Sequence, residues 1–288
     1  MRKFLLAVLS LVCATVLGQI EQNVNKTTGT ESNAISDIDS IRFNTNQTEM
    51  EIIFNNGGIE SHSISEINNV TFSGDAELYP PNTVHCEEPT EVIDVINPVT
   101  GKTWMDRNLG AQRVAISATD EDAYGDLYQW GRGADGHQCR NSPTTSTISS
   151  VDNPGHGDYI LGSGDNVTPP YRDWISPQNH NLWQGVNGTN NPCPIGYRIP
   201  TDFECDAEIA SWSNPNSIGA FSSPLKLTMG GSRFDNDGSI NFVGAKAGYW
   251  TSSTTDEWSG ALVFDNTVAE VHSFYVRATA YSVRCIKN

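Results

Sequence analysis

The chain is short of positive charge. Its 288 residues hold 17 Lys and Arg against 34 Asp and Glu, which gives a formal net charge of −17 at pH 7. A chain this acidic repels phosphate backbones and anionic lipid headgroups. We therefore expect no nucleic-acid partner and no electrostatic attachment to membranes. The charge favours solubility outside the cell, and clustered carboxylates make cation binding the alternative interpretation.

The chain also lacks long apolar runs, except for one at its start. Two basic residues precede the apolar stretch 4–17, which is too short to span a bilayer. Val16 and Gly18 are small enough for the −3 and −1 positions of a cleavage site. These features predict a signal peptide at 1–18 and a mature chain that begins at Gln19. The protein is expected to be secreted or held at the cell surface, without membrane insertion.

Motifs of common enzyme and metal sites are missing. The sequence contains no Gly-x-Ser-x-Gly elbow, no His-x-x-x-His pair and no Cys-x-x-Cys pair. The six His residues are scattered and lie mostly in predicted loops. We therefore favour a protein without catalytic residues. A secreted hydrolase or oxidase, with its site spread over loops, is the alternative.

The N-terminal part divides into short pieces by composition. Residues 19–33 are polar and aperiodic, which predicts a flexible lead. Residues 34–73 contain an internal repeat, in which an Ile-Ser-Asp-Ile phrase returns as Ile-Ser-Glu-Ile. The turn Asn55–Gly58 between β-rich runs is a strong hairpin signal, so this stretch is expected to be a small β-module. The proline-containing residues 74–90 are expected to form a linker.

Residues 91–288 are expected to form one α+β domain. The best helix candidate is Asp202–Trp212, because Thr201 and Glu204 form a capping-box pattern at its start. An opening hairpin precedes it, short strands follow it, and long irregular loops separate them. This order is typical of an α+β domain with few helices and short antiparallel strands. We expect the opening hairpin and the closing strand Val283–Ile286 to meet in a small sheet.

Five phrases in this domain carry a family resemblance. They are Gly101–Gly110, Tyr128–Gly131, Cys193–Thr201, Gly248–Ser253 and Ser282–Lys287. In this order they resemble the Fibrobacter succinogenes major paralogous domain, a secreted bacterial module often grouped with C-type-lectin-like folds. The resemblance implies a C-type-lectin-like domain at 91–288. Residues 34–73 resemble short N-terminal β-adapters of secreted Bacteroidetes-type proteins.

Five cysteines remain after the signal peptide, and an exported chain meets an oxidising environment. In the resembling family, cysteines at the positions of Cys193 and Cys285 recur together, which implies a disulfide between them. Cys86–Cys139 is expected as the second bridge, with Cys139–Cys205 as its competitor. Cys205 stands where the family more often has an apolar or aromatic residue, so it is expected to be the odd thiol.

Two sets of residues are candidates for ligand contact. Trp174, Trp183 and Trp258 lie in predicted loops and can stack on sugar rings, with core packing as the alternative. Asp235 and Asp237 belong to an Asp-x-Asp-Gly pattern, which is a fragment of a calcium loop. Calcium is therefore the one candidate cofactor. An ordinary hairpin turn is the other interpretation of this pattern.

The sequence predicts a secreted or cell-surface interaction module without catalytic activity. We expect it to bind a glycan or an extracellular protein through loops in 131–192 and 232–258, because binding residues concentrate on such loops. A structural surface or matrix protein, assembled through residues 34–73, is a third interpretation beside the hydrolase or oxidase.

Overall fold

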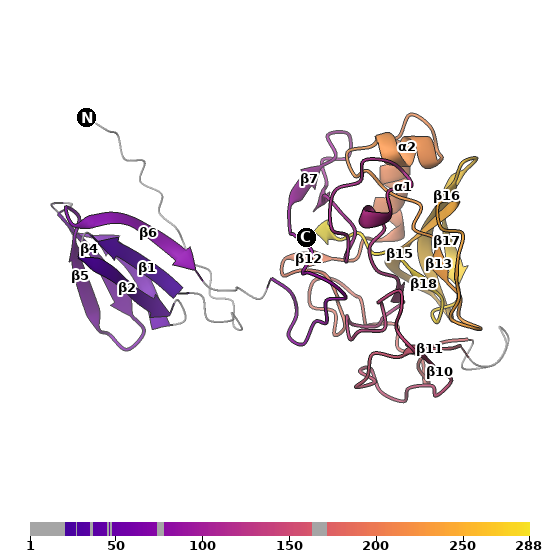
Figure 1. Ribbon diagram of the computed structural model, residues 1–288, viewed down its shortest axis with the longest axis horizontal. Coiled ribbons are helices and arrows are strands. Elements are labelled where there is room, and N and C mark those ends of the chain that lie inside the picture. The colour runs from indigo at the N-terminus through magenta and orange to yellow at the C-terminus, as the bar shows by residue number, and fades with distance from the viewer. Residues whose placement is uncertain are drawn as a thin grey trace. The chain divides into compact units, whose positions relative to one another are not determined.

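The computed structural model describes residues 21–26, 28–34, 37–44, 46, 48–73, 78–162 and 172–288. They fall into two compact units, with the boundary between Leu78 and Tyr79 (Figure 1). The signal peptide expected at 1–18 lies outside the described residues. Within these residues, no helix has the length and apolar character needed to cross a membrane.

The first unit consists of two three-stranded antiparallel sheets, with the strand orders β2-β1-β6 and β3-β4-β5. The strands are β1 (Glu21–Lys26), β2 (Gly29–Ala34), β3 (Ile38–Phe43), β4 (Glu49–Phe54), β5 (Ile59–Ser63) and β6 (Ile67–Ser73). Val24 of the first sheet joins Ile38, Met50 and Ile52 of the second in one buried cluster. The two sheets therefore pack against each other around a small core.

The flexible lead expected at 19–33 is wrong for its described residues, because they form most of β1 and β2. Val24 of β1 is fully buried and lies opposite Val70 of β6. The sequence does not reveal this strand because the residues around Val24 are polar and show no alternating apolar pattern. Its pairing depends on backbone hydrogen bonds and one buried side chain. The turn Asn55–Gly58 joins β4 to β5, as its residues predict, and Phe54 N donates to Gly58 O.

The second unit combines short strands with short helices. Its strands are β7 (Asp94–Ile96), β8 (Thr103–Met105), β9 (Tyr128–Gln129), β10 (Thr144–Thr145), β11 (Tyr159–Ile160), β12 (Tyr197–Arg198), β13 (Ser232–Arg233), β14 (Ile240–Asn241), β15 (Lys246–Thr255), β16 (Trp258–Asp265), β17 (Ala269–Tyr275), β18 (Ala280–Tyr281) and β19 (Ile286–Lys287). Its helices are the 3-10 helix η2 (Glu121–Ala123), α1 (Asp202–Ala210) and α2 (Ser217–Ser222).

These strands form small sheets with the orders β12-β19-β8-β7, β14-β13-β18-β9 and β15-β16-β17, together with the parallel pair β10-β11. Ile286 of β19 lies opposite Trp104 of β8. The closing strand thus meets the opening hairpin, which confirms that part of the sequence prediction. The described architecture is mostly β, with small antiparallel sheets and few helices.

Helix α1 begins at the predicted residue, and its N-terminus has the predicted capping box. Thr201 Oγ1 accepts from Glu204 N at 3.3 Å, and Glu204 Oε2 accepts from Thr201 N at 2.9 Å. Burial favours a higher pKa for Glu204, but hydrogen bonds from Arg198 and Thr201 lower that pKa to about 2. Asp202 accepts from Ser273 Oγ of β17 at 2.6 Å, which fixes the helix on the sheet β15-β16-β17.

Both expected disulfides are present. The Cα atoms lie 5.9 Å apart in Cys193–Cys285 and 5.4 Å apart in Cys86–Cys139. Cys205 is buried and unbridged in α1, so the competing pair Cys139–Cys205 is wrong. Burial raises the pKa of the Cys205 thiol well above its ordinary value, which makes this thiol unreactive. The two bridges fit an oxidising environment.

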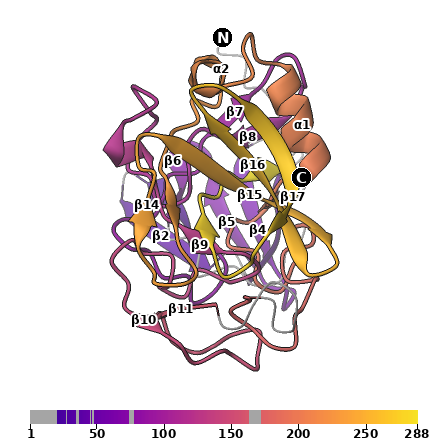
Figure 2. The ribbon, with the colours of Figure 1, turned by 90° about the vertical axis from the view of Figure 1, so that its right-hand side faces the viewer.

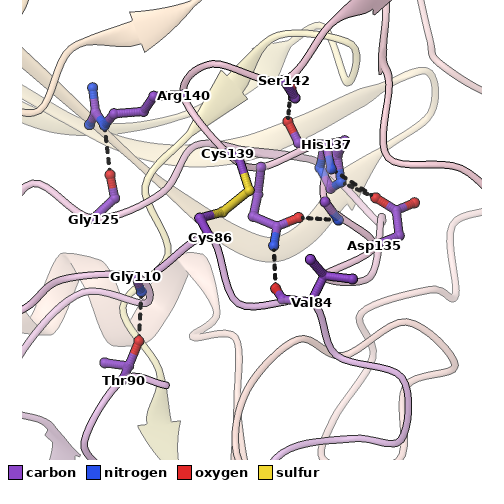
Figure 3. The surroundings of a disulfide bond; sticks show 12 residues. Val84, Cys86, Thr90, Gly110, Gly125, Asp135, His137, Cys139, Arg140 and Ser142 are labelled. Carbon is purple, nitrogen blue, oxygen red and sulfur yellow. Dashed lines mark hydrogen bonds and ion pairs between the residues drawn. A yellow bond between two sulfur atoms is a disulfide. The ribbon is translucent and has the colours of Figure 1, made fainter. Parts of the chain in front are cut away.

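The segment expected as a linker, 74–90, belongs to the second unit from Tyr79 onward. Tyr79 is buried in the main core of that unit. Figure 3 shows the surroundings of the Cys86–Cys139 bond, where Val84 O accepts a hydrogen bond from Gln138 Nε2 at 2.7 Å. The disulfide and this hydrogen bond fix the segment, so the domain begins earlier than the sequence predicts.

Candidate ligand-binding groove

Two of the three candidate tryptophans lie in the core. Trp174 and Trp183 each have an exposed fraction of 0 %, so the alternative interpretation, core packing, holds for both and neither can stack on a sugar ring. Trp174 Nε1 donates to Trp130 O at 2.7 Å, and the rings of Trp183 and Trp130 lie 5.5 Å apart. The described residues of 131–192 have little regular structure, so large aromatic side chains supply much of the apolar area that they bury.

Trp258 lies at the first position of β16, opposite Thr255 of β15, and is half-buried. It is not among the residues that line the groove described below. The three tryptophans proposed from the sequence therefore do not form one stacking surface.

Asp235 and Asp237 lie on the β13–β14 connection but have separate partners. Asp235 is buried, its Oδ2 lies 2.5 Å from Arg172 Nη2, and its Oδ1 accepts from Thr279 Oγ1 at 3.3 Å. Asp237 is exposed, and hydrogen bonds from the hydroxyl and backbone N–H of Ser239 lower its pKa. The contacts of Asp237 are those of an ordinary turn, whereas Asp235 is paired with the distant residues Arg172 and Thr279. Calcium binding at this turn stays a prediction.

A groove of about 670 Å³ lies over one face of the sheet β15-β16-β17. Residues of β17, β18 and the β13–β14 hairpin line it together with the ends of β15 and β16. Figure 2 shows this sheet beside α1. Alternation along β17 places Glu270, His272 and Phe274 in the groove, while Ser273 faces the helix and bonds Asp202. The groove is therefore the face of the sheet that α1 leaves uncovered.

One wall of the groove is a tyrosine ring packed onto a glycine. A Cβ atom at Gly248 of β15 would lie 2.2 Å from Cδ1 of Tyr281 in β18. Only glycine therefore lets this ring approach the strand so closely. The Tyr281 ring lies 4.7 Å from that of Trp250 and 5.4 Å from that of Tyr275. Burial raises the pKa of Tyr281, so its hydroxyl keeps its proton at neutral pH.

Phenylalanines from two elements add exposed aromatic surface to the groove. Phe274 of β17 is 59 % exposed, and Phe242 after β14 is 49 % exposed. The Phe274 ring lies 5.3 Å from that of Tyr275, and the Phe242 ring lies 5.8 Å from that of Phe234. Each exposed ring is thus held by a second aromatic ring and presents surface on which a ligand can stack.

Polar side chains of both signs line the same groove. His272 Nε2 lies 2.6 Å from Glu270 Oε1, and Lys246 Nζ lies 5.3 Å from the centre of the Phe242 ring. Burial and the charge of Glu270 raise the pKa of Tyr275, which therefore remains a hydrogen-bond donor. Together with the Arg172–Asp235 pair, these groups offer donors and acceptors beside aromatic rings. The arrangement suits a ligand with both hydroxyl groups and apolar faces.

The sequence interpretation missed the aromatic residues of this groove. Among the described residues of 131–192, only Arg172 lines it, whereas the stretch 232–258 contributes several lining residues. The overlooked signal lies in β17, where an aromatic residue, Phe274, shares one face with Glu270 and His272. A strand face that is both charged and aromatic is not a core face.

Comparisons with known protein families, with curated proteins and with solved structures found no match for this chain.

Proposed function

We propose that the second unit is a secreted or cell-surface binding module whose groove takes a glycan. The observation that carries this proposal is the combination of exposed rings, Phe242 and Phe274, with the Glu270–His272 pair in one groove of about 670 Å³. A sugar ring has apolar C–H faces that stack on aromatic rings and hydroxyl groups that bond to carboxylate and imidazole. The groove offers both kinds of contact within one surface.

The scaffold around the groove supports the same proposal. The contacts of Tyr281 with Gly248 and Trp250 fix its position, and a fixed wall loses little conformational freedom on binding. Two disulfides suit work outside the cell. The proposal includes a C-type-lectin-like fold for this unit. It is supported by the resemblance of the five phrases and by the pairing of the closing strand β19 with β8 of the opening hairpin.

The experiment is a glycan array with the purified mature chain, with and without calcium, followed by calorimetry on the best glycan. Phe274→Ala and Phe242→Ala should each weaken binding by about tenfold or more, because each removes a stacking surface. Phe203→Ala is the matched control, since Phe203 is 85 % exposed but lies on α1, away from the groove. It should leave the affinity unchanged.

The alternatives give different results in the same experiment. Binding that persists equally in Phe274→Ala would contradict the groove as the site. A chain that binds no glycan but does bind an extracellular protein would contradict the glycan ligand. Shorter sugar products after incubation would favour the hydrolase interpretation. A calcium requirement would favour the turn at Asp235 and Asp237 as part of the site.

A further inference from the structure

Two carboxylates and one histidine meet in the first unit, whereas the groove belongs to the second. His62 and Glu60 lie on β5, and Glu31 lies on β2. Glu31 Oε2 is 3.3 Å from His62 Nδ1, and Glu60 Oε1 is 3.7 Å from His62 Nε2. One ligand atom from each of the three residues lies within 4.8 Å of the other two.

The strand arrangement explains why these side chains converge. Glu60 and His62 are two residues apart on β5, so they point to the same side of the strand. Strand β2 stands at one end of the sheet β2-β1-β6, and β5 stands at one end of β3-β4-β5 (Figure 1). Asn33 Nδ2 of β2 donates to Glu60 Oε2 at 2.9 Å, which brings these two strands together. The cluster thus joins the two sheets of the first unit.

His62 lacks the hydrogen bonds that a buried imidazole ordinarily has. Only 2 % of its surface is exposed, and neither ring nitrogen has a hydrogen-bond partner among the described residues. A buried polar group without a partner destabilises the fold. A bound ligand would give the His62 imidazole the partner that it lacks. The nearest facing atoms are carboxylate oxygens, which attract a cation.

Both carboxylates are already oriented by their other oxygens. Lys26 Nζ lies 2.8 Å from Glu31 Oε1, and Asn33 bonds Glu60 Oε2. The oxygens that remain, Glu31 Oε2 and Glu60 Oε1, are the ones that face His62. Outer contacts that hold ligating carboxylates in this way are usual around protein metal sites.

We propose that Glu31, Glu60 and His62 bind a divalent first-row transition metal ion, with Zn²⁺ as the representative. One imidazole with two carboxylates suits Zn²⁺ and its neighbours, whereas Ca²⁺ and Mg²⁺ take oxygen ligands. Tetrahedral Zn²⁺ with bonds of about 2.0–2.1 Å holds its ligands about 3.3 Å apart and takes one nitrogen of an imidazole. Because Glu31 faces Nδ1 and Glu60 faces Nε2, one of the two carboxylates has to rotate toward the nitrogen that the other faces when the ion binds. The partly exposed carboxylates give the ion a path from solvent. A bound ion links β2 to β5.

The test is metal binding to the full mature chain. Co²⁺ absorption spectra report the ligand geometry, and calorimetry with Zn²⁺ reports affinity and stoichiometry. His62→Gln, Glu31→Gln and Glu60→Gln should each weaken Zn²⁺ binding at least tenfold. Glu66→Gln is the matched control, because it removes the same charge from an exposed position of the same unit. It should bind as the wild type does.

The two glutamate variants keep His62, so they test the site even where His62→Gln fails to fold. Equal Zn²⁺ binding in these variants and in Glu66→Gln would overturn the proposal, as would no binding by the wild type at millimolar Zn²⁺. Ca²⁺ that displaces Co²⁺ at equal concentration would overturn the choice of a transition metal. Loss of the Co²⁺ spectrum in the folded glutamate variants alone would support the proposal.

Discussion

Gly248→Ala tests the contact that shapes the groove. The added Cβ would lie 2.2 Å from Tyr281 Cδ1 and 2.6 Å from its Cγ and Cε1. Carbon atoms in good contact lie about 3.5–4.0 Å apart. To reach that distance from the added Cβ, the ring has to move by roughly 1 Å or more. Trp250 and Tyr275 pack beside that ring and resist the movement. Overpacking of this kind costs about 1–3 kcal/mol.

A double-mutant cycle with Tyr281→Ala isolates this clash. Once the ring is absent, Gly248→Ala should be neutral or should stabilise by about 0.4–1 kcal/mol, because alanine restricts the unfolded chain. The coupling energy between the two positions is therefore expected to be about 1–3 kcal/mol. Gly133→Ala is the matched control, because a Cβ there meets its nearest atoms at 4.0 Å. It should change stability by less than about 0.5 kcal/mol.

Urea unfolding followed by tryptophan fluorescence is the assay. All seven tryptophans lie at residue 104 or later, so the signal reports the second unit alone. Equal stabilities of Gly248→Ala and Gly133→Ala would refute the close packing of Tyr281 on β15. Additive effects of Gly248→Ala and Tyr281→Ala would refute it as well.

Two further predictions concern the stability of the second unit. Replacing Cys193 and Cys285 together by Ala should lower the free energy of unfolding by about 4–5 kcal/mol, because the bridge spans 92 residues. An unchanged urea midpoint would contradict this. Lowering the pH from 6.5 to 4 should destabilise the unit by up to about 3 kcal/mol through His137, because burial lowers its pKa from 6.5 to about 4 and only the unfolded state takes up the proton in that range. Its Nε2 accepts from Gln129 N at 3.0 Å, a bond that protonation breaks. His137→Gln should lose this part of the pH dependence, and parallel pH profiles for the two proteins would count against the assignment.

Features with local signals could be predicted from the sequence. The start of α1 follows from Thr201 and Glu204, whose side chains and backbone satisfy each other within one turn. The hairpin at Asn55–Gly58 follows from residues that tolerate the turn conformation. The bridge Cys193–Cys285 was accessible through the family resemblance, because the phrases around both cysteines were recognisable.

Features that depend on long-range packing could not be predicted. Whether a loop tryptophan is buried depends on distant partners, as for Trp183, which packs on Trp130. The polar residues of β1 form a strand because β6 pairs with them, and that pairing spans most of the first unit. The groove needs Gly248 next to Tyr281, two residues that a periodic pattern does not connect. Burial and pairing between remote residues thus limited the site prediction more than the fold prediction.

The exposed face of β17 is itself an argument for a ligand. Among the strands that the structure describes, β17 pairs with β16 alone, so it is the edge strand of its sheet, and Phe274 is 59 % exposed on it. An edge strand with an exposed aromatic residue favours unwanted pairing between chains, and proteins ordinarily place charged residues at such edges. Glu270 and His272 are there, yet Phe274 stands two residues further along the same face. A polar residue at this position would protect the edge better than a phenylalanine does, and a binding role explains why the position is aromatic. Phe274→Ala is therefore the first variant to measure.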